Sequence, residues 1–117
     1  MTREFSRTAE RRLGQASVEL VAALPALGAC ILIAAQAVAA GWALWAAGNA
    51  ARAGARAEHV GGDAEAVARR ALPGTLRDDA RVSAAGGVRV SVQVPGLLPG
   101  ITMPSVSAAS SLDAAQR

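Results

Sequence analysis

Charged residues divide the chain into three parts. Residues 1–14 are polar and carry both arginines and glutamates, whereas the run from Leu20 to Ala51 has no charged residue. As a helix rising about 1.5 Å per residue, this run exceeds the roughly 20 residues that cross the hydrocarbon core of a bilayer. After Ala51, arginines and acidic residues are mixed along the rest of the chain. We therefore predict one membrane-spanning helix near the N-terminus.

The same pattern sets the predicted boundaries of an α+β protein. A basic leader occupies residues 1–14, and a long apolar helix occupies residues 15–60, with its first part spanning the membrane. Gly61 and Gly62 end this helix, because glycine tolerates the left-handed conformation of a helix C-cap. A small α+β region then occupies residues 61–117.

A short helix opens the small region. Asp63 is a favourable N-cap for a helix that runs to Leu72. Pro73 and Gly74 stop this helix, since proline does not continue a helical turn. Thr75 and Asp78 have the spacing of a helix capping box, with aspartate in the less usual acidic place.

A small antiparallel sheet follows. Val88–Val94 alternates valine with polar residues, which predicts a strand with its valines on one face. Gly86–Gly87 has the turn residues of a hairpin that joins this strand to a shorter one at Arg81–Ala84. Ser105–Ser111 predicts a third, weaker strand, with Pro104 at its start. The sheet thus has two or three strands.

Composition limits the core and the partners. The chain has only three aromatic residues, Phe5, Trp42 and Trp45, so the second half must build its core from aliphatic side chains. About 65 residues of that kind give a core of marginal stability, which needs further stabilisation by partners or a membrane. The basic residues are all arginines, spread among acidic residues, with no aromatic after Trp45 to stack on bases. This argues against nucleic-acid binding.

The leader and the tryptophans predict the orientation in the membrane. A short basic N-terminal tail stays in the cytoplasm, so the C-terminal part lies outside. Trp42 and Trp45 lie about one helical turn apart, and roughly 30 Å beyond Val21 along the helix. This places them at the outer membrane interface, where tryptophan rings tend to settle. Core packing in the small region is the alternative.

A glycine and a glutamate stand at the junction of the leader and the apolar run. Gly14 is the last residue of the basic leader, and Glu19 comes five residues later, directly before Leu20. A peptidase that works at the membrane face needs an unhindered segment, and Gly14 has no side chain to obstruct it. A carboxylate facing hydrocarbon costs about 2.5–3.5 kcal/mol if it is unpaired. The simpler interpretation of Glu19 is an acidic residue in the first turn of a helix, where it meets the positive end of the dipole.

This junction resembles the processing site of type IV prepilins. Residues Gly14–Leu20, followed by Leu24 and Pro25, are similar to the start of the TadE-like minor pseudopilins of tight-adherence pilus systems. The resemblance implies that prepilin peptidase removes the leader after Gly14. It also implies that Glu19 pairs with the new amine of Gln15 on a neighbouring subunit and sets the axial register.

The resemblance further implies a structural function in the assembly or at the tip of a tight-adherence type IV pilus. The implied partners are other pilin and pseudopilin subunits, prepilin peptidase, the inner-membrane platform of the tight-adherence system and membrane lipid. The specific part of the resemblance covers roughly residues 11–50. The C-terminal part is similar only in general character, with a valine-rich strand and a tail rich in proline and glycine.

Two other signals compete for the same segment. Leu27–Cys30 has the form of a lipobox, at which lipoproteins are cut and acylated on cysteine. Ala37–Ala39 has the form of a signal-peptidase site, which would release a secreted protein starting near Ala40. The apolar run continues well past Cys30, which disfavours the lipoprotein. A plain signal-anchored envelope protein is the remaining alternative.

Small residues recur at helical spacing along the long helix. Ala37 and Gly41 form one such series, and Ala46, Ala50 and Gly54 form a second. Such spacing allows close helix packing, as in a bundle of pilin stems, although an alanine-rich composition also produces it.

Nothing in the sequence predicts an enzyme, a cofactor or a metal site. His59 is the only histidine and Cys30 the only cysteine, and neither belongs to a recognisable catalytic or ligand motif.

Overall fold

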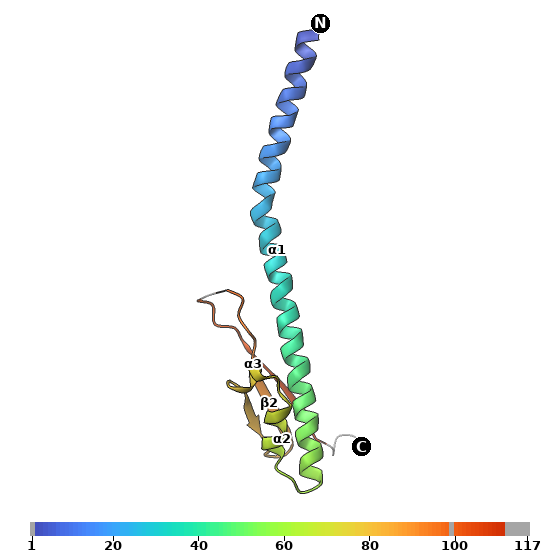
Figure 1. Ribbon diagram of the computed structural model, residues 1–117, viewed down its shortest axis with the longest axis vertical. Helices are drawn as coiled ribbons and strands as arrows, with labels where there is room; N and C mark the ends of the chain where they lie inside the picture. The colour runs from blue at the N-terminus through green and yellow to red at the C-terminus, as the bar shows by residue number, and fades with distance from the viewer. Residues whose placement is uncertain (1, 99, 112–117) are drawn as a thin grey trace. The chain divides into compact units, whose positions relative to one another are not determined.

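A computed structural model describes residues 2–98 and 100–111, with side chains from Ala16 onward. In chain order its elements are α1 (Thr2–His59), α2 (Ala64–Ala71), α3 (Gly74–Arg77), β1 (Arg81–Ser83), β2 (Val88–Gln93) and β3 (Ser105–Ser110) (Figure 1). The predicted fold class is confirmed: a long apolar helix precedes a short helix and an antiparallel sheet of three strands.

The chain forms two compact units, and the boundary between them falls inside α1. The first unit ends at Ala35 and consists of the N-terminal part of that helix. The second unit, Gln36–Arg117, contains the rest of α1 together with α2, α3 and the sheet. The part of α1 from Gln36 to His59 therefore belongs to the same compact unit as the sheet.

Glycine ends α1 as predicted. Gly61 has a positive φ of 74°, which the missing Cβ permits. The Gly62 N–H donates to the Ala57 carbonyl at 2.8 Å, and the Gly61 N–H donates to the Glu58 carbonyl at 3.0 Å. This pair of bonds is the Schellman motif, which satisfies carbonyls that a helix end would leave without partners.

Capping interactions define both ends of α2. The Asp63 carboxylate accepts a hydrogen bond from the Ala66 N–H at 3.0 Å, so the predicted N-cap is confirmed. At the other end, the Arg77 guanidinium donates to the carbonyls of Arg70 and Leu72 at 3.3 and 3.0 Å. A cation at this position also meets the negative end of the helix dipole.

One helical turn, α3, follows where the sequence suggested only a stop. Pro73 is its N-cap residue, and no side chain caps it, so the capping box suggested for Thr75 and Asp78 does not form. Leu76 lies in this turn and is 2% exposed. Burial of this leucine against the sheet is what stabilises a turn too short to be stable alone.

The sheet has the order β1-β2-β3, and both pairings are antiparallel. Val90 in the central strand lies opposite Val82 of β1 and Ala108 of β3. Because side chains alternate along a strand, these three residues share one face, toward the core. Gly86 and Gly87 both have positive φ in the connection between β1 and β2, as the predicted hairpin requires.

Alanines of α1 pack against the valines of the central strand. Val88, Val90 and Val92 are fully buried, which confirms the predicted valine face. The helix residues in the same core are all alanines, each at most 4% exposed: Ala43, Ala46, Ala47, Ala50, Ala51 and Ala55. A helix with so many side chains of one carbon can approach a sheet closely. Among the described side chains, no aromatic residue belongs to this core.

Gly54 lies at the closest approach of α1 to its neighbours. A Cβ atom at this position would lie 2.8 Å from Cγ1 of Val88 and 2.9 Å from the Ala64 carbonyl oxygen. Both distances are shorter than van der Waals contact, and one neighbour is backbone. By contrast, a Cβ atom at Gly48 would meet its nearest neighbours at 3.8–4.0 Å.

We expect Gly54→Ala to lower the free energy of unfolding by about 1–2 kcal/mol. Overpacking costs about 1–3 kcal/mol, and the higher helix propensity of alanine recovers at most about 1 kcal/mol. Gly48→Ala is the matched control, and it should raise the stability by up to about 1 kcal/mol. Pulse proteolysis of the full chain in detergent measures both. Equal effects of the two substitutions would contradict the close approach at Gly54.

Candidate functional site

The first unit presents apolar side chains to its surroundings. Seven of its large apolar residues are 57–70% exposed, and Leu32 is half-buried. The seven are Val18, Leu20, Val21, Leu24, Leu27, Ile31 and Ile33. Residues Ala16–His59 of α1 are long and apolar enough to cross a membrane by length and composition. The predicted single membrane-spanning helix is compatible with this structure.

The predicted processing site precedes the described side chains. Gly14 and Gln15 lie within α1, but their side chains are outside the described part of the chain. The Glu19 side chain is described, and it is exposed. Among the residues with described side chains, the ion pair found is that of Arg69 with Glu65 at 3.6 Å. Glu19 therefore forms no ion pair with any of those residues. The carboxylate of Glu19 is thus presented to the surroundings of the helix.

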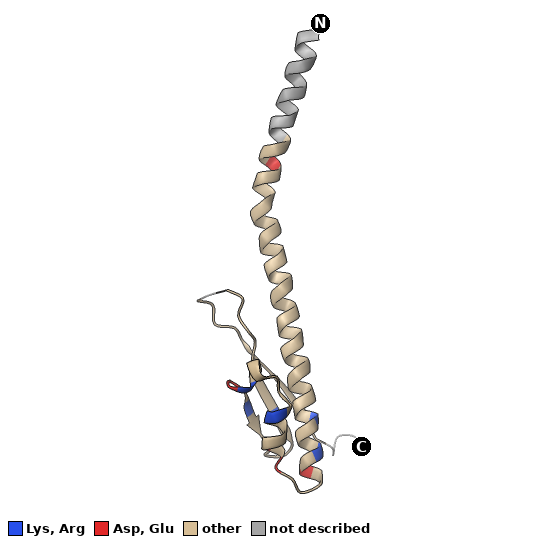
Figure 2. Cartoon of the chain, in the orientation of Figure 1, with Lys and Arg blue, Asp and Glu red and all other residues tan. Residues whose placement is uncertain are grey.

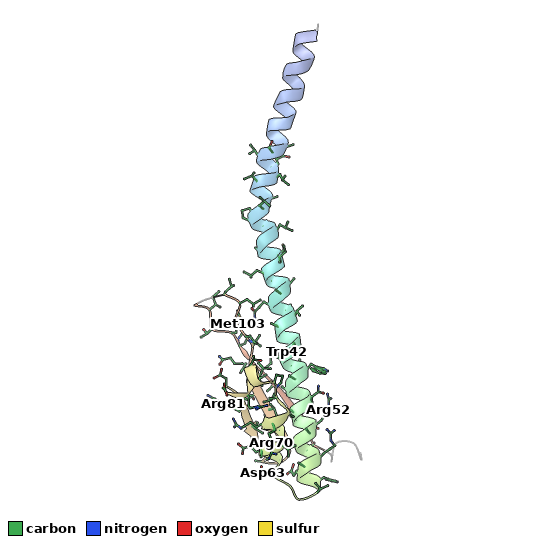
Figure 3. All side chains as sticks on the ribbon, viewed as in Figure 1. Trp42, Arg52, Asp63, Arg70, Arg81 and Met103 are labelled. Atoms are coloured by element: carbon green, nitrogen blue, oxygen red, sulfur yellow. The ribbon has the colours of Figure 1, made fainter. Side chains whose placement is uncertain are left out.

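Trp42 and Trp45 lie on the outside of the domain. Their side chains are 40% and 64% exposed, and neither belongs to the buried core. Leu44 beside them is 48% exposed. The core of this domain therefore does not use the tryptophans, and their predicted place at a membrane interface stays a prediction. Figure 3 shows Trp42 on the helix, with Arg52 nearer the helix C-terminus.

The two series of small residues have different surroundings. Ala46, Ala50 and Gly54 are buried inside the domain, where they allow the sheet and α2 to approach α1. Ala37 and Gly41 are exposed, and a Cβ atom at Gly41 would have no neighbour within 4 Å. Of the two series, only Ala37 and Gly41 are therefore exposed for contact with another helix.

Gln36 holds a loop of the domain through both ends of its side-chain amide. Its Nε2 donates to the carbonyl of Pro95 at 3.1 Å, and its Oε1 accepts from the N–H of Leu97 at 3.2 Å. These bonds join positions about 60 residues apart in the chain. The sequence contained one signal of this arrangement, because Gln36 and Asn49 are the only side-chain amides between Leu20 and Ala51.

Open, polar hollows occur on the described surface of the domain. One has a volume of about 330 Å³ and lies at the β1–β2 turn, lined in part by Ser83, Arg89 and Ser110. The other has a volume of about 620 Å³ and is lined in part by Asp78, Asp79 and Arg81. Neither hollow combines a nucleophile with a base at hydrogen-bond distance.

Metal-binding groups do not gather in the described residues. No three His, Cys, Asp or Glu side chains there lie close enough to hold a metal ion. His59 lies in the last turn of α1, at the negative end of the helix dipole, and Cys30 is a free, exposed cysteine of the first unit.

These features define the class of the protein: one long apolar helix, compatible with a single-pass membrane anchor, whose C-terminal part belongs to a small α+β domain. Searches of protein-family models, of curated proteins and of solved structures found no match.

Proposed function

We propose that the chain is a minor pseudopilin that helps to assemble or tip a tight-adherence type IV pilus. The observation that carries this proposal is the arrangement of a basic leader, Gly14, Glu19 and then an uninterrupted apolar helix. The exposed carboxylate of Glu19 at the edge of that helix and the exposed apolar side chains that follow it support the same function. The N-terminus faces the cytoplasm, and the C-terminal part of the chain lies on the extracytoplasmic side of the membrane.

Processing then has a defined chemical result. Prepilin peptidase hydrolyses the bond between Gly14 and Gln15, which leaves a positive amine about one helical turn from Glu19. In an assembly, Glu19 of one subunit pairs with the new N-terminal amine of a neighbouring subunit. The pair neutralises two charges that would each be costly in hydrocarbon. The tight-adherence inner-membrane platform is where these subunits meet.

The fold disfavours the two alternative cleavage sites. A signal-peptidase cut near Ala40 would separate Gln36 from the loop that its amide holds. A lipoprotein cut before Cys30 would leave the lipid on a residue inside a helix that continues to His59, without the polar tether that usually follows an acylated cysteine. Both alternatives stay distinguishable by experiment.

We expect Gly14→Val to block maturation while membrane insertion continues. Valine obstructs the scissile bond with a branched side chain, whereas Gly41→Val places the same side chain in open space further along the helix. The measurement is mass spectrometry of the membrane-bound chain with sequencing of its N-terminus. The wild type and the Gly41→Val control should both begin at Gln15.

Each other N-terminus would contradict the proposal in its own way. An acylated Cys30 identifies a lipoprotein, a chain starting at Ala40 identifies a secreted protein, and an intact leader identifies a plain signal anchor. A Gly14→Val chain that matures to the wild-type mass would show that the cleavage site lies elsewhere.

A further inference from the structure

The loop between β2 and β3 carries apolar side chains that the domain leaves uncovered. Leu97, Leu98 and Ile101 are 48%, 37% and 55% exposed. Met103 behaves differently, since it is half-buried and packs against the core at the base of the loop. The loop therefore has an anchored base and an apolar outer part (Figure 3).

Charge is absent from this whole part of the domain. No charged residue occurs between Arg89 and Asp113 in the sequence, and none occurs in α1 between Glu19 and Arg52. Figure 2 shows the same separation in space, with the described charges of the domain away from the loop and from the part of α1 next to it. An uncharged loop beside an uncharged stretch of helix is suited to a medium that does not solvate ions.

Gln36 fixes the position of the loop along α1. Both polar ends of its amide bond to the loop backbone, at Pro95 and Leu97. Figure 1 shows the loop extending from the sheet in the direction away from the turn that follows His59. Gln36 precedes Trp42 by six residues, which is about 9 Å along a helix.

This position lies at the outer edge of the proposed membrane span. Counting about 20 residues from Leu20 brings the edge of the hydrocarbon to about Ala39. Gln36 lies three residues before that edge and Trp42 three residues after it, so the loop bound to Gln36 lies at the boundary of the proposed span. The two hydrogen bonds also give the Gln36 amide the partners that hydrocarbon cannot supply.

We propose that the loop is a second membrane contact, in which Leu97, Leu98 and Ile101 insert into the interfacial region of the outer leaflet. The proposal rests on the membrane anchor of the proposed function, but not on its role in a pilus. The backbone of an irregular loop cannot be satisfied in the hydrocarbon core, so the loop stays at the boundary between headgroups and acyl chains. Its side chains point into the lipid while Gln36 holds its base.

Three single-cysteine probes test the insertion in the full chain, in a Cys30→Ala background. An environment-sensitive fluorophore is attached at Ile101→Cys in the loop, at Ile33→Cys in the apolar helix, or at Ser107→Cys on the exposed face of β3. The protein is reconstituted alone into phosphatidylethanolamine–phosphatidylglycerol vesicles with and without doxyl-labelled lipid. We expect blue-shifted emission and lipid quenching at positions 33 and 101, and neither at position 107.

The outcomes separate the loop from the anchor. Quenching at position 33 without quenching at position 101 overturns the loop contact and leaves the anchor intact. Absence of quenching at position 33 overturns both the loop contact and the membrane anchor. A probe at position 101 that becomes shielded only after other pilin subunits are added assigns the loop to a protein partner, which also overturns the proposal.

Gln36→Ala tests, in the same assay, whether the two hydrogen bonds of the Gln36 amide hold the loop in place. Without the amide the loop base is released, and quenching at position 101 should fall toward the level at position 107. Asn49→Ala is the control, because this second amide of the apolar run accepts from Arg52 at 2.7 Å and does not touch the loop. Unchanged quenching in Gln36→Ala would show that the Gln36 amide does not hold the loop in the membrane interface.

Discussion

Residues 55–117 expressed alone are expected to remain largely unfolded, whereas residues 36–117 form a folded domain. The shorter chain lacks the helix alanines from Ala43 to Ala51 that cover the valine face of the central strand. Burial of a valine contributes about 1.5–3 kcal/mol. Three fully buried valines therefore contribute an amount comparable to the 5–15 kcal/mol that separates a whole small domain from its unfolded state.

Circular dichroism melts and the spread of amide signals in NMR spectra of both fragments measure this difference. The longer fragment serves as the control, since it contains the same sheet with its helical cover. Its exposed Trp42 and Trp45 call for a mild detergent in both samples. A cooperative melt of residues 55–117 above about 60 °C, which is typical of a well-built small domain, would contradict the expectation.

Replacement of Glu19 by glutamine is expected to abolish association with other pilins while leaving processing at Gly14 intact. If the carboxylate served only the helix dipole, its loss would cost about 0.3–1 kcal/mol, less than about tenfold in affinity. If it pairs with the amine of a neighbour, its loss leaves that amine unpaired at the edge of hydrocarbon. That costs about 2.5–3.5 kcal/mol, or roughly 100-fold in affinity.

Co-purification with the other pilins, together with counts of pili on cells, distinguishes these two roles. Glu19→Asp is the matched variant, because it keeps the charge on a side chain shorter by one methylene and should retain partial activity. Wild-type association of Glu19→Gln would leave Glu19 as a partner of the helix dipole. A loss of cleavage at Gly14 in the same variant would make it a recognition residue for the peptidase.

Local patterns predicted most elements of the domain. Alternation of valines from Val88 onward placed the central strand and its buried face, because the side-chain period of a strand is two. Asp63 and Gly61 marked helix ends through capping chemistry that depends on only a few neighbouring residues. The third strand was also predicted, with its end one residue beyond the observed Ser110.

The part of α1 that belongs to the domain core was not visible in the sequence. Alanine and leucine surround the whole helix from Leu20 onward, so its two faces differ too little in hydrophobicity for the buried face to stand out. The buried face is distinguished by size instead, since it consists of alanines that fit against Val90. Such complementarity depends on the partner strand, which the helix sequence alone does not contain.

The contact of Gln36 with the loop illustrates a second limit. A glutamine in an apolar run signals that some partner must satisfy its amide, but the partner here is backbone about 60 residues away. Carbonyl and N–H groups are the same in every residue, so no side chain of the loop identifies Pro95 and Leu97 as the bonded positions. The one-turn helix at Leu76 was missed for a similar reason, since its burial decides its conformation.

The alanine–valine core also determines how mechanical load would pass through the domain. A pull on the sheet reaches α1 through many parallel contacts between Ala43 and Ala55, and it does not have to pass through the turn at Gly61. The Gln36 bonds tie the loop to the other end of the same stretch. Force along the helix would therefore shear a whole interface at once, which resists rupture better than peeling the contacts apart one by one.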